Sequence, residues 1–261
     1  MNLSLSRKNA LVGGASAGIG RAVAAELAAL GASVTLLART ESTLREAVAS
    51  LDRSQGQQHG YLVVDFADSP TLLQRVNALL TAQTVHILVN NTGGPPGGPI
   101  TAASPEAFLA AYHNHLICNQ LLAQAVLPGM AAAGYGRIVN IISTSVKEPI
   151  EGLGVSNSTR AAVAAWAKTW AGEVARHGIT VNNVLRGFTS TGRLTEIIEK
   201  RAAASGQSIE ATEQFFRSVV PAGRFAAPEE VAGVVAFLAS PAAGYINGIN
   251  LPVDGGRTKS L

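Results

Sequence analysis

The stretch Asn9-Ala10-Leu11-Val12-Gly13 and the following Gly14-Ala15-Ser16-Ala17-Gly18-Ile19-Gly20 decide the fold of this chain. The apolar run predicts a buried strand, and the pattern that begins at Ile19 predicts a helix directly after the glycine-rich turn. Glycine permits a tight turn and close approach to a ligand, and the free N–H groups of a helix amino terminus bind phosphate. We therefore predict a pyrophosphate-binding turn whose contacting residues are Gly14, Ser16, Ala17, Gly18, Ile19 and Gly20.

Short apolar runs alternate with helical stretches along the rest of the chain. The runs are mostly continuous, which is typical of parallel strands buried on both faces. We expect strands at 9–13, 33–38, 61–64, 86–89, 137–142, 179–185 and 248–253. We expect helices at 19–30, 41–51, 71–80, 106–130 with a break near Tyr112, 155–176, 194–204, 209–219 and 228–238. This order predicts an α/β fold, a Rossmann-type doubly wound parallel sheet with helices on both faces.

The whole chain of 261 residues is expected to form one domain, because no linker or internal repeat divides it. The stretch 187–221 interrupts the alternation with additional helices that follow the carboxyl end of a predicted strand. Ligands bind at that edge of a parallel sheet, so we predict that this stretch is a lid over the site.

Composition and charge exclude several classes of protein. With 47% apolar and 14% charged residues, the chain is far too apolar to be disordered. The net charge of +3 comes from scattered residues without a basic run, which favours a small anionic ligand over nucleic acid. The single cysteine, Cys118, cannot form an intrachain disulfide, and the start of the chain lacks a secretory-signal pattern. We therefore expect a cytoplasmic protein.

The segment between Glu106 and Arg137 lacks full charges and resembles a membrane span in length. Several amides are spread through it, at Asn114, Asn119, Gln120 and Gln124. We therefore expect a buried or subunit-contacting helix and no membrane partner. This segment and the alanine-rich helix after Ser156 are too apolar for an open surface, which predicts a homo-oligomer.

The ends of the next strands suggest which dinucleotide is bound. A carboxylate at the end of the second strand would accept hydrogen bonds from the ribose 2′-hydroxyl of NAD, but this chain has Arg39 there, which suits a 2′-phosphate. Asp65 follows the third strand and could accept a hydrogen bond from the adenine amino group. Asn91 and Gly93 follow the fourth strand at the same edge of the sheet. The predicted cofactor is NADP(H).

In this order and spacing, the motifs of the chain resemble those of the short-chain dehydrogenase/reductase family over essentially the whole length. They are the Gly14 to Gly20 turn, Asn90-Asn91-Thr92-Gly93, Gly136-Arg137-Ile138-Val139-Asn140, Gly178-Ile179-Thr180-Val181-Asn182, Gly223-Arg224 with Pro228-Glu229-Glu230-Val231-Ala232, and Val253-Asp254-Gly255-Gly256. The members most similar in motif are 3-oxoacyl-(acyl-carrier-protein) reductases. The resemblance implies a nicotinamide cofactor, a small-molecule carbonyl or alcohol substrate and usually a homotetramer.

The same resemblance assigns the active-site positions and shows a degenerate motif. The family's Asn and Ser correspond to Asn114 and Ser143, but its Tyr and Lys correspond to Ser156 and Arg160. Arg160 also takes the Lys position on the cofactor ribose. The family's Pro-Gly beside the nicotinamide is here Arg186-Gly187, and Thr189 follows as a further cofactor-binding position.

These replacements leave three functions open. Serine is a far weaker acid than a tyrosine beside a cation, and losing a positioned acid removes about 10²–10⁴-fold in rate. The chain could be an NADP(H)-dependent oxidoreductase with an unusual acid, or a cofactor-binding protein with a regulatory or subunit role. Arg160 also suggests the halohydrin dehalogenases, although the chain lacks their tyrosine. Lys147, His113 and His115 are the alternative proton donors.

Overall fold

A computed structural model describes residues 1–260 and shows one seven-stranded sheet in the order β3-β2-β1-β4-β5-β6-β7. All neighbouring strands in it are parallel. The strands are β1 (Asn9–Gly13), β2 (Ser33–Ala38), β3 (Gly60–Val63), β4 (Ile87–Asn90), β5 (Gly136–Ser143), β6 (Ile179–Arg186) and β7 (Asn250–Val253). The predicted Rossmann-type doubly wound sheet is thus confirmed.

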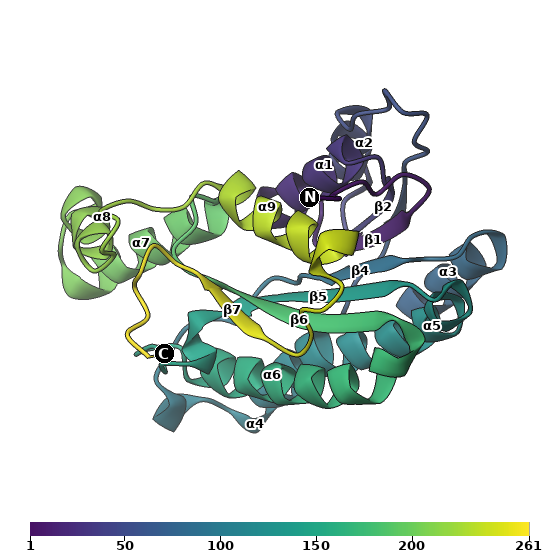
Figure 1. Cartoon of the computed structure of the whole chain (residues 1–261). Helices are drawn as coiled ribbons and strands as arrows, with labels where there is room; N and C mark the ends of the chain where they lie inside the picture. The colour runs from purple at the N-terminus through teal and green to yellow at the C-terminus, as the bar shows by residue number, and fades with distance from the viewer. Residues whose placement is uncertain (261) are drawn as a thin grey trace.

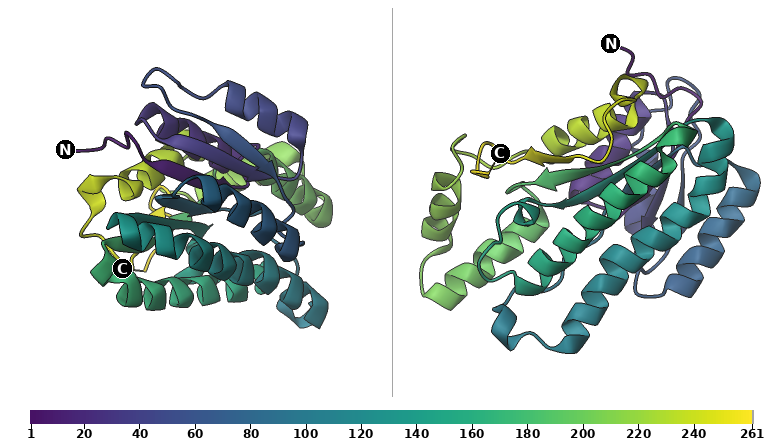
Figure 2. Two further views of the ribbon diagram at one scale, coloured as in Figure 1. Left: turned by 90° about the vertical axis from the view of Figure 1, so that its right-hand side faces the viewer. Right: turned by 60° about the horizontal axis from the view of Figure 1, so that its bottom comes forward.

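Helices cover both faces of this sheet (Figures 1 and 2). One face packs against α1 (Gly18–Ala29), α2 (Glu41–Ala49) and α9 (Pro228–Ala239). The other packs against α3 (Ser69–Ala82), α5 (Cys118–Ala133) and α6 (Gly154–Val174). Two further helices, α7 (Gly192–Ser205) and α8 (Ile209–Ser218), project beyond the carboxyl ends of the strands (Figure 1).

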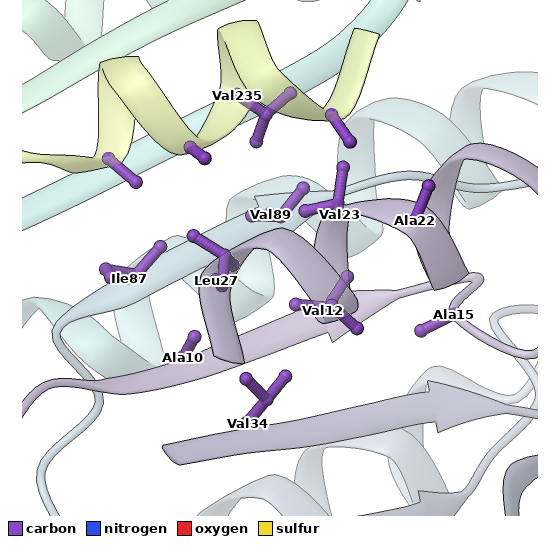
Figure 3. Close-up of a cluster of buried hydrophobic side chains, with 14 of the residues drawn as sticks. Ala10, Val12, Ala15, Ala22, Val23, Leu27, Val34, Ile87, Val89 and Val235 are labelled. Atoms are coloured by element: carbon purple, nitrogen blue, oxygen red, sulfur yellow. The ribbon is translucent and has the colours of Figure 1, made fainter. Parts of the chain in front are cut away.

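Two hydrophobic cores fix these layers because the strands are buried on both faces. In β5, every residue from Gly136 to Ile142 is buried, as continuous apolar strands predict. On the α1 side, Val23 of α1 and Val235 of α9 face Val12 and Val89 of the sheet (Figure 3). Across the sheet, the indole N–H groups of Trp166 and Trp170 both donate to the Gln120 Oε1 atom, at 2.7 and 2.9 Å, which ties α6 to α5.

The long uncharged segment contains three helical pieces. Helix α4 (Pro105–Tyr112) leads into a π-helix, His113–Ile117, which continues as α5. The break near Tyr112 is therefore located correctly, but the predicted end at residue 130 is three residues too early. Helix α5 (Cys118–Ala133) contains Pro128. It is capped by Gly134, whose positive φ of 60° favours glycine. By length and composition alone, Pro105–Ala133 could cross a membrane; 33% of its apolar window is buried within this chain.

Four asparagines, of which Asn90, Asn140 and Asn183 are buried, join four neighbouring strands through their side chains. Asn90 donates to Asn140, Asn140 to Asn183, and Asn183 to Asn250, each at 2.8 Å. These residues are paired in register on β4, β5, β6 and β7. An unsatisfied buried amide costs about 1–3 kcal/mol, so this ladder favours a single register of the four strands.

Candidate active site

The glycine-rich turn between β1 and α1 forms a cradle for a ligand. Gly14 and Gly18 have φ values of 56° and 54°, a backbone region that favours glycine. A Cβ on Gly20 would stand 2.3 Å from the Gly14 carbonyl oxygen, so no larger residue fits there. Among the described residues, no side chain caps the amino terminus of α1. Its N–H groups are therefore available to an anion.

The other turn residues lie as the sequence predicts. Ala17 is the N-cap residue of α1, Ser16 is half-buried and Ile19 is buried in the core. The Asn91 amide donates to the carbonyl oxygens of Gly13 and Gly14, at 3.2 and 3.4 Å. The end of β4 is thus held against the turn. The turn fits a pyrophosphate group, since backbone atoms and free donors line it.

The residues predicted to contact the adenosine half of the cofactor are exposed to solvent. Arg39 is exposed directly after β2 and makes no hydrogen bond or ion pair within residues 1–260. Asp65 is exposed and accepts a hydrogen bond from the Ala67 N–H at 3.0 Å. Gly93 is exposed, with open space around it. These positions leave Arg39 and Asp65 accessible to a ligand.

Asn114, Ser143 and Ser156 come from three different elements. Asn114 is half-buried in the π-helix, and Ser143 ends β5, where its hydroxyl accepts from the Ser145 N–H at 3.1 Å. Ser156 is half-buried in the first turn of α6 and makes no side-chain hydrogen bond with the described residues. Ser143 thus stands at the carboxyl end of β5, Ser156 at the start of α6, and Asn114 on the helical segment before α5.

Arg160 is buried, with 6% of its surface exposed. Its Nη1 donates to the Ile141 carbonyl oxygen at 3.4 Å, and its Nη2 lies 3.8 Å from where a Cβ on Gly94 would stand. Burial, followed by repulsion from the charge of Arg186, lowers the pKa of Arg160 to about 9. Arg160 thus stays protonated at neutral pH and can stabilise negative charge.

The segment after β6 carries the remaining predicted residues. Arg186 is the register partner of Ser143, and burial together with the charge of Arg193 lowers its pKa. Gly187 lies against Asp254, where a Cβ would be 2.7 Å from the Asp254 Cα. Thr189 is 1% exposed and donates to the Gly187 carbonyl oxygen at 3.3 Å. Gly187 and Thr189 are therefore placed to shape the backbone at this edge of the sheet.

His115, which the sequence analysis names as an alternative proton donor, is buried in the site region. It is 2% exposed, its Nδ1 is hydrogen-bonded to the Thr92 hydroxyl, and the charge of Arg160 acts on it. Burial, then this charge, lowers the pKa of His115 to about 2. His115 is therefore neutral at physiological pH. Its neighbour His113 has a buried Nε2 atom without a hydrogen-bond partner among the described residues.

Beyond the strand ends, α7 and α8 border an open cavity of about 360 Å³. Its lining includes Thr191, which also contacts the cradle, since a Cβ on Gly18 would stand 3.2 Å from the Thr191 Cγ2. On the other side, Glu148 accepts hydrogen bonds from the backbone N–H groups of Lys259 and Ser260, at 2.6 and 2.9 Å. The carboxyl-terminal residues are thus attached to the loop that follows Ser143.

A parallel sheet in this order, with an uncapped glycine turn at the point where the strand order reverses, defines a dinucleotide-binding protein of the Rossmann class. The family model described as enoyl-(acyl carrier protein) reductase matches residues 14–258. The chain belongs to this family, the short-chain dehydrogenases/reductases, which confirms the resemblance identified in the sequence.

Relatives match along nearly the whole chain. The 3-oxoacyl-(acyl-carrier-protein) reductase of Pseudomonas aeruginosa is 34% identical over 99% of this chain and 100% of its own. L-sorbose reductase from Gluconobacter frateurii, solved with NADPH and L-sorbose, has a TM-score of 0.93 and 32% identity, with all of both chains covered. An actinorhodin polyketide ketoreductase variant, solved with NADPH, has a TM-score of 0.90 and 32% identity, with 97% of this chain and 98% of the other covered.

His115 should make the fold sensitive to acid. Its folded pKa of about 2 lies below the ordinary 6.5, so stability is full above pH 6.5 and falls as the unfolded chain takes up a proton. At pH 5 this linkage amounts to about 2 kcal/mol. His115→Gln should therefore reduce the loss of unfolding free energy between pH 7.5 and 5 by that amount, as measured by urea denaturation. The exposed His177→Gln should not, and an unchanged loss in His115→Gln would contradict the interpretation.

Proposed function

We propose that the protein is an NADP(H)-dependent oxidoreductase that interconverts a carbonyl and an alcohol in an atypical site, with Ser156 and Arg160 at the family's Tyr and Lys positions. The uncapped glycine turn, which only a closely approaching ligand would use, is the observation that carries the proposal. Family membership and relatives solved with NADPH support it. Arg39, in place of a carboxylate after β2, favours a 2′-phosphate.

In this proposal the turn residues bind the pyrophosphate through backbone N–H groups, and Asp65 accepts from the adenine amino group. Asn91 holds the turn open, while Gly93 leaves room for the ligand. Arg160 takes the ribose position, and Gly187 and Thr189 form the wall beside the nicotinamide. Each assignment follows the position of the residue at the carboxyl edge of the sheet.

The bound cofactor supplies a hydride to the carbonyl carbon. The hydroxyl groups of Ser143 and Ser156 donate hydrogen bonds to the carbonyl oxygen, and the charge of Arg160 stabilises the negative charge that develops there. A serine hydroxyl is too weak an acid to surrender its own proton, so the oxygen takes its proton from water ordered by these groups. Asn114 lies on the π-helix that joins α4 to α5, and in this proposal it supports the same site.

One observation favours the second candidate, an NADP(H)-binding protein with a regulatory or subunit role. A serine and an arginine replace the family's Tyr and Lys. The pKa of the arginine is lowered to about 9, so the guanidinium still holds its proton at neutral pH. Such a site binds the cofactor without a positioned proton donor. NADPH binding without oxidation of NADPH by any carbonyl substrate would favour this candidate.

We also propose a lid over the substrate and a homotetrameric assembly. Residues 187–221 carry α7, α8 and the cavity between them, which suits a lid over the substrate. Ile100, Leu109 and Ile117 expose apolar surface near or on α4 and the π-helix, which supports a homo-oligomer with this face buried. The proposed assembly is a homotetramer and the proposed location is the cytoplasm. Light scattering at micromolar concentration should give a tetramer, and a monomer would contradict this proposal.

Arg39 should set the cofactor preference. Arg39→Ala removes the charge that would pair with the 2′-phosphate, so we expect NADPH affinity to fall about tenfold or more with little change for NADH. Fluorescence titration with both cofactors measures this. Arg53→Ala, which removes another exposed arginine beyond α2, is the matched control and should change neither affinity. Equal affinities of the wild-type protein for both cofactors would contradict the prediction.

Restoring the family's Tyr and Lys should increase the rate of NADPH-dependent ketone reduction. In the Ser156→Tyr/Arg160→Lys double variant a phenol stands beside a cation, so oxidation of NADPH with a reducible ketone should rise at least about tenfold. Arg186→Pro in the same background tests whether Arg186 crowds the nicotinamide. A wild-type rate near ~10 s⁻¹ with a simple ketone would contradict the premise, because a different residue would then supply the proton. Lys147→Met is the next variant in that case.

A further inference from the structure

Arg160 and Arg186 bring two positive charges together at the carboxyl ends of β5 and β6. Arg160 reaches β5 from α6 and donates to the Ile141 carbonyl oxygen. Arg186 ends β6 beside Ser143, its register partner on β5. The charge of Arg186 is near enough to lower the pKa of Arg160, so the two guanidinium groups repel one another.

Within residues 1–260, no carboxylate neutralises this pair. The four ion pairs there are Arg45–Glu41, Arg193–Glu196, Arg217–Glu213 and Arg224–Glu230. A guanidinium has five N–H donors, yet Arg160 makes one long hydrogen bond at 3.4 Å while 6% exposed. Arg186 makes no side-chain hydrogen bond with the described residues. Buried charges are ordinarily paired, so the site is incomplete without an anion.

The strands that carry Ser143 and Arg186 are separated from the strand that carries the glycine turn, where the phosphates of the cofactor are expected. In the sheet order, β6 lies three strands from β1, which carries the glycine turn. At about 4.8 Å between strands, this separation is roughly 14 Å. Arg39, which would bind the 2′-phosphate, is one strand further away on β2. Arg186 instead lies beside Ser143, where the proposed reaction places the carbonyl oxygen.

We propose that the substrate is a short oxo acid whose carboxylate is bound by Arg186, with Arg160 behind it, while its carbonyl oxygen lies at Ser143. The inference rests on the proposed function, which supplies the carbonyl. Because Ser143 and Arg186 face each other on adjacent strands, one or two carbons separate the carboxylate from the carbonyl. A guanidinium suits a carboxylate, since its two parallel N–H groups match the two oxygens.

The test compares acids with their methyl esters. Acetoacetate and 4-oxopentanoate, which have one and two carbons between carboxylate and carbonyl, are each titrated calorimetrically against their methyl esters into the protein with NADP⁺, which cannot reduce them, so binding is measured without turnover. At least one acid should bind about tenfold or more tightly than its ester, as a charged hydrogen-bonded pair provides. Wild-type protein that binds acid and ester equally, or binds neither acid, overturns the proposal.

Variants assign the preference to the arginine. Arg186→Gln should abolish the acid preference and leave the ester affinity within about twofold, while Arg186→Lys should retain part of the preference. Arg201→Gln removes an exposed arginine from the neighbouring helix α7 and changes the net charge equally, so it should keep the full preference. Thermal unfolding of Arg186→Gln verifies its fold. A full preference in folded Arg186→Gln overturns the proposal.

Two further titrations separate this inference from the proposed function. If Arg186→Gln loses affinity for NADP⁺ but keeps the acid preference, the arginines serve the cofactor and the proposal is wrong. If the wild-type protein does not bind NADP⁺, the proposed function fails, and the titration of acid and ester without cofactor still decides whether the arginine pair binds a carboxylate.

Discussion

The close approach of two chain segments at the β1–α1 turn is the constraint on which the site depends. The Asn91 side chain donates to the carbonyl oxygens of Gly13 and Gly14, and Gly20 leaves no space for a Cβ. This contact joins the first strand to β4, its neighbour across the point where the strand order reverses. Because the glycines admit the backbone so closely, α1 presents free N–H groups to the same edge that carries Ser143 and Arg186.

In the active site that we propose, the charges differ from those of a typical family member. A Tyr–Lys pair delivers a proton, whereas Ser156 and Arg160 leave hydroxyl groups beside a fixed positive charge. With Arg186 added, the site holds one buried and one half-buried positive charge, which the proposed anionic substrate would neutralise. Ligand binding and folding stability are therefore coupled here, since an anion that binds the folded chain removes an electrostatic cost.

Much of this arrangement could be predicted from the sequence because the signals are local. Continuous apolar runs gave the parallel strands, and the glycine turn after the first of them located the cofactor edge. The observed ends of elements differ from the predicted ends by a residue or two, as at β3. Helix α5 continues past the predicted end at residue 130 to Ala133. The asparagine ladder and the contact of His115 with Thr92 were missed. Each joins residues far apart in sequence, so no periodicity could show it.

Phe188 joins helix α8 to the carboxyl-terminal residues through contacts of its ring. Its ring stacks on Phe216 of α8 with centroids 4.9 Å apart, and the Arg257 guanidinium lies 4.8 Å from its centroid. Arg257 also donates to the Thr144 hydroxyl, directly after Ser143. A shift of α8 therefore reaches both the carboxyl-terminal residues and the loop after β5. Because Arg186 lies two residues before Phe188, we expect a movement of the proposed lid to change the position of this positive charge.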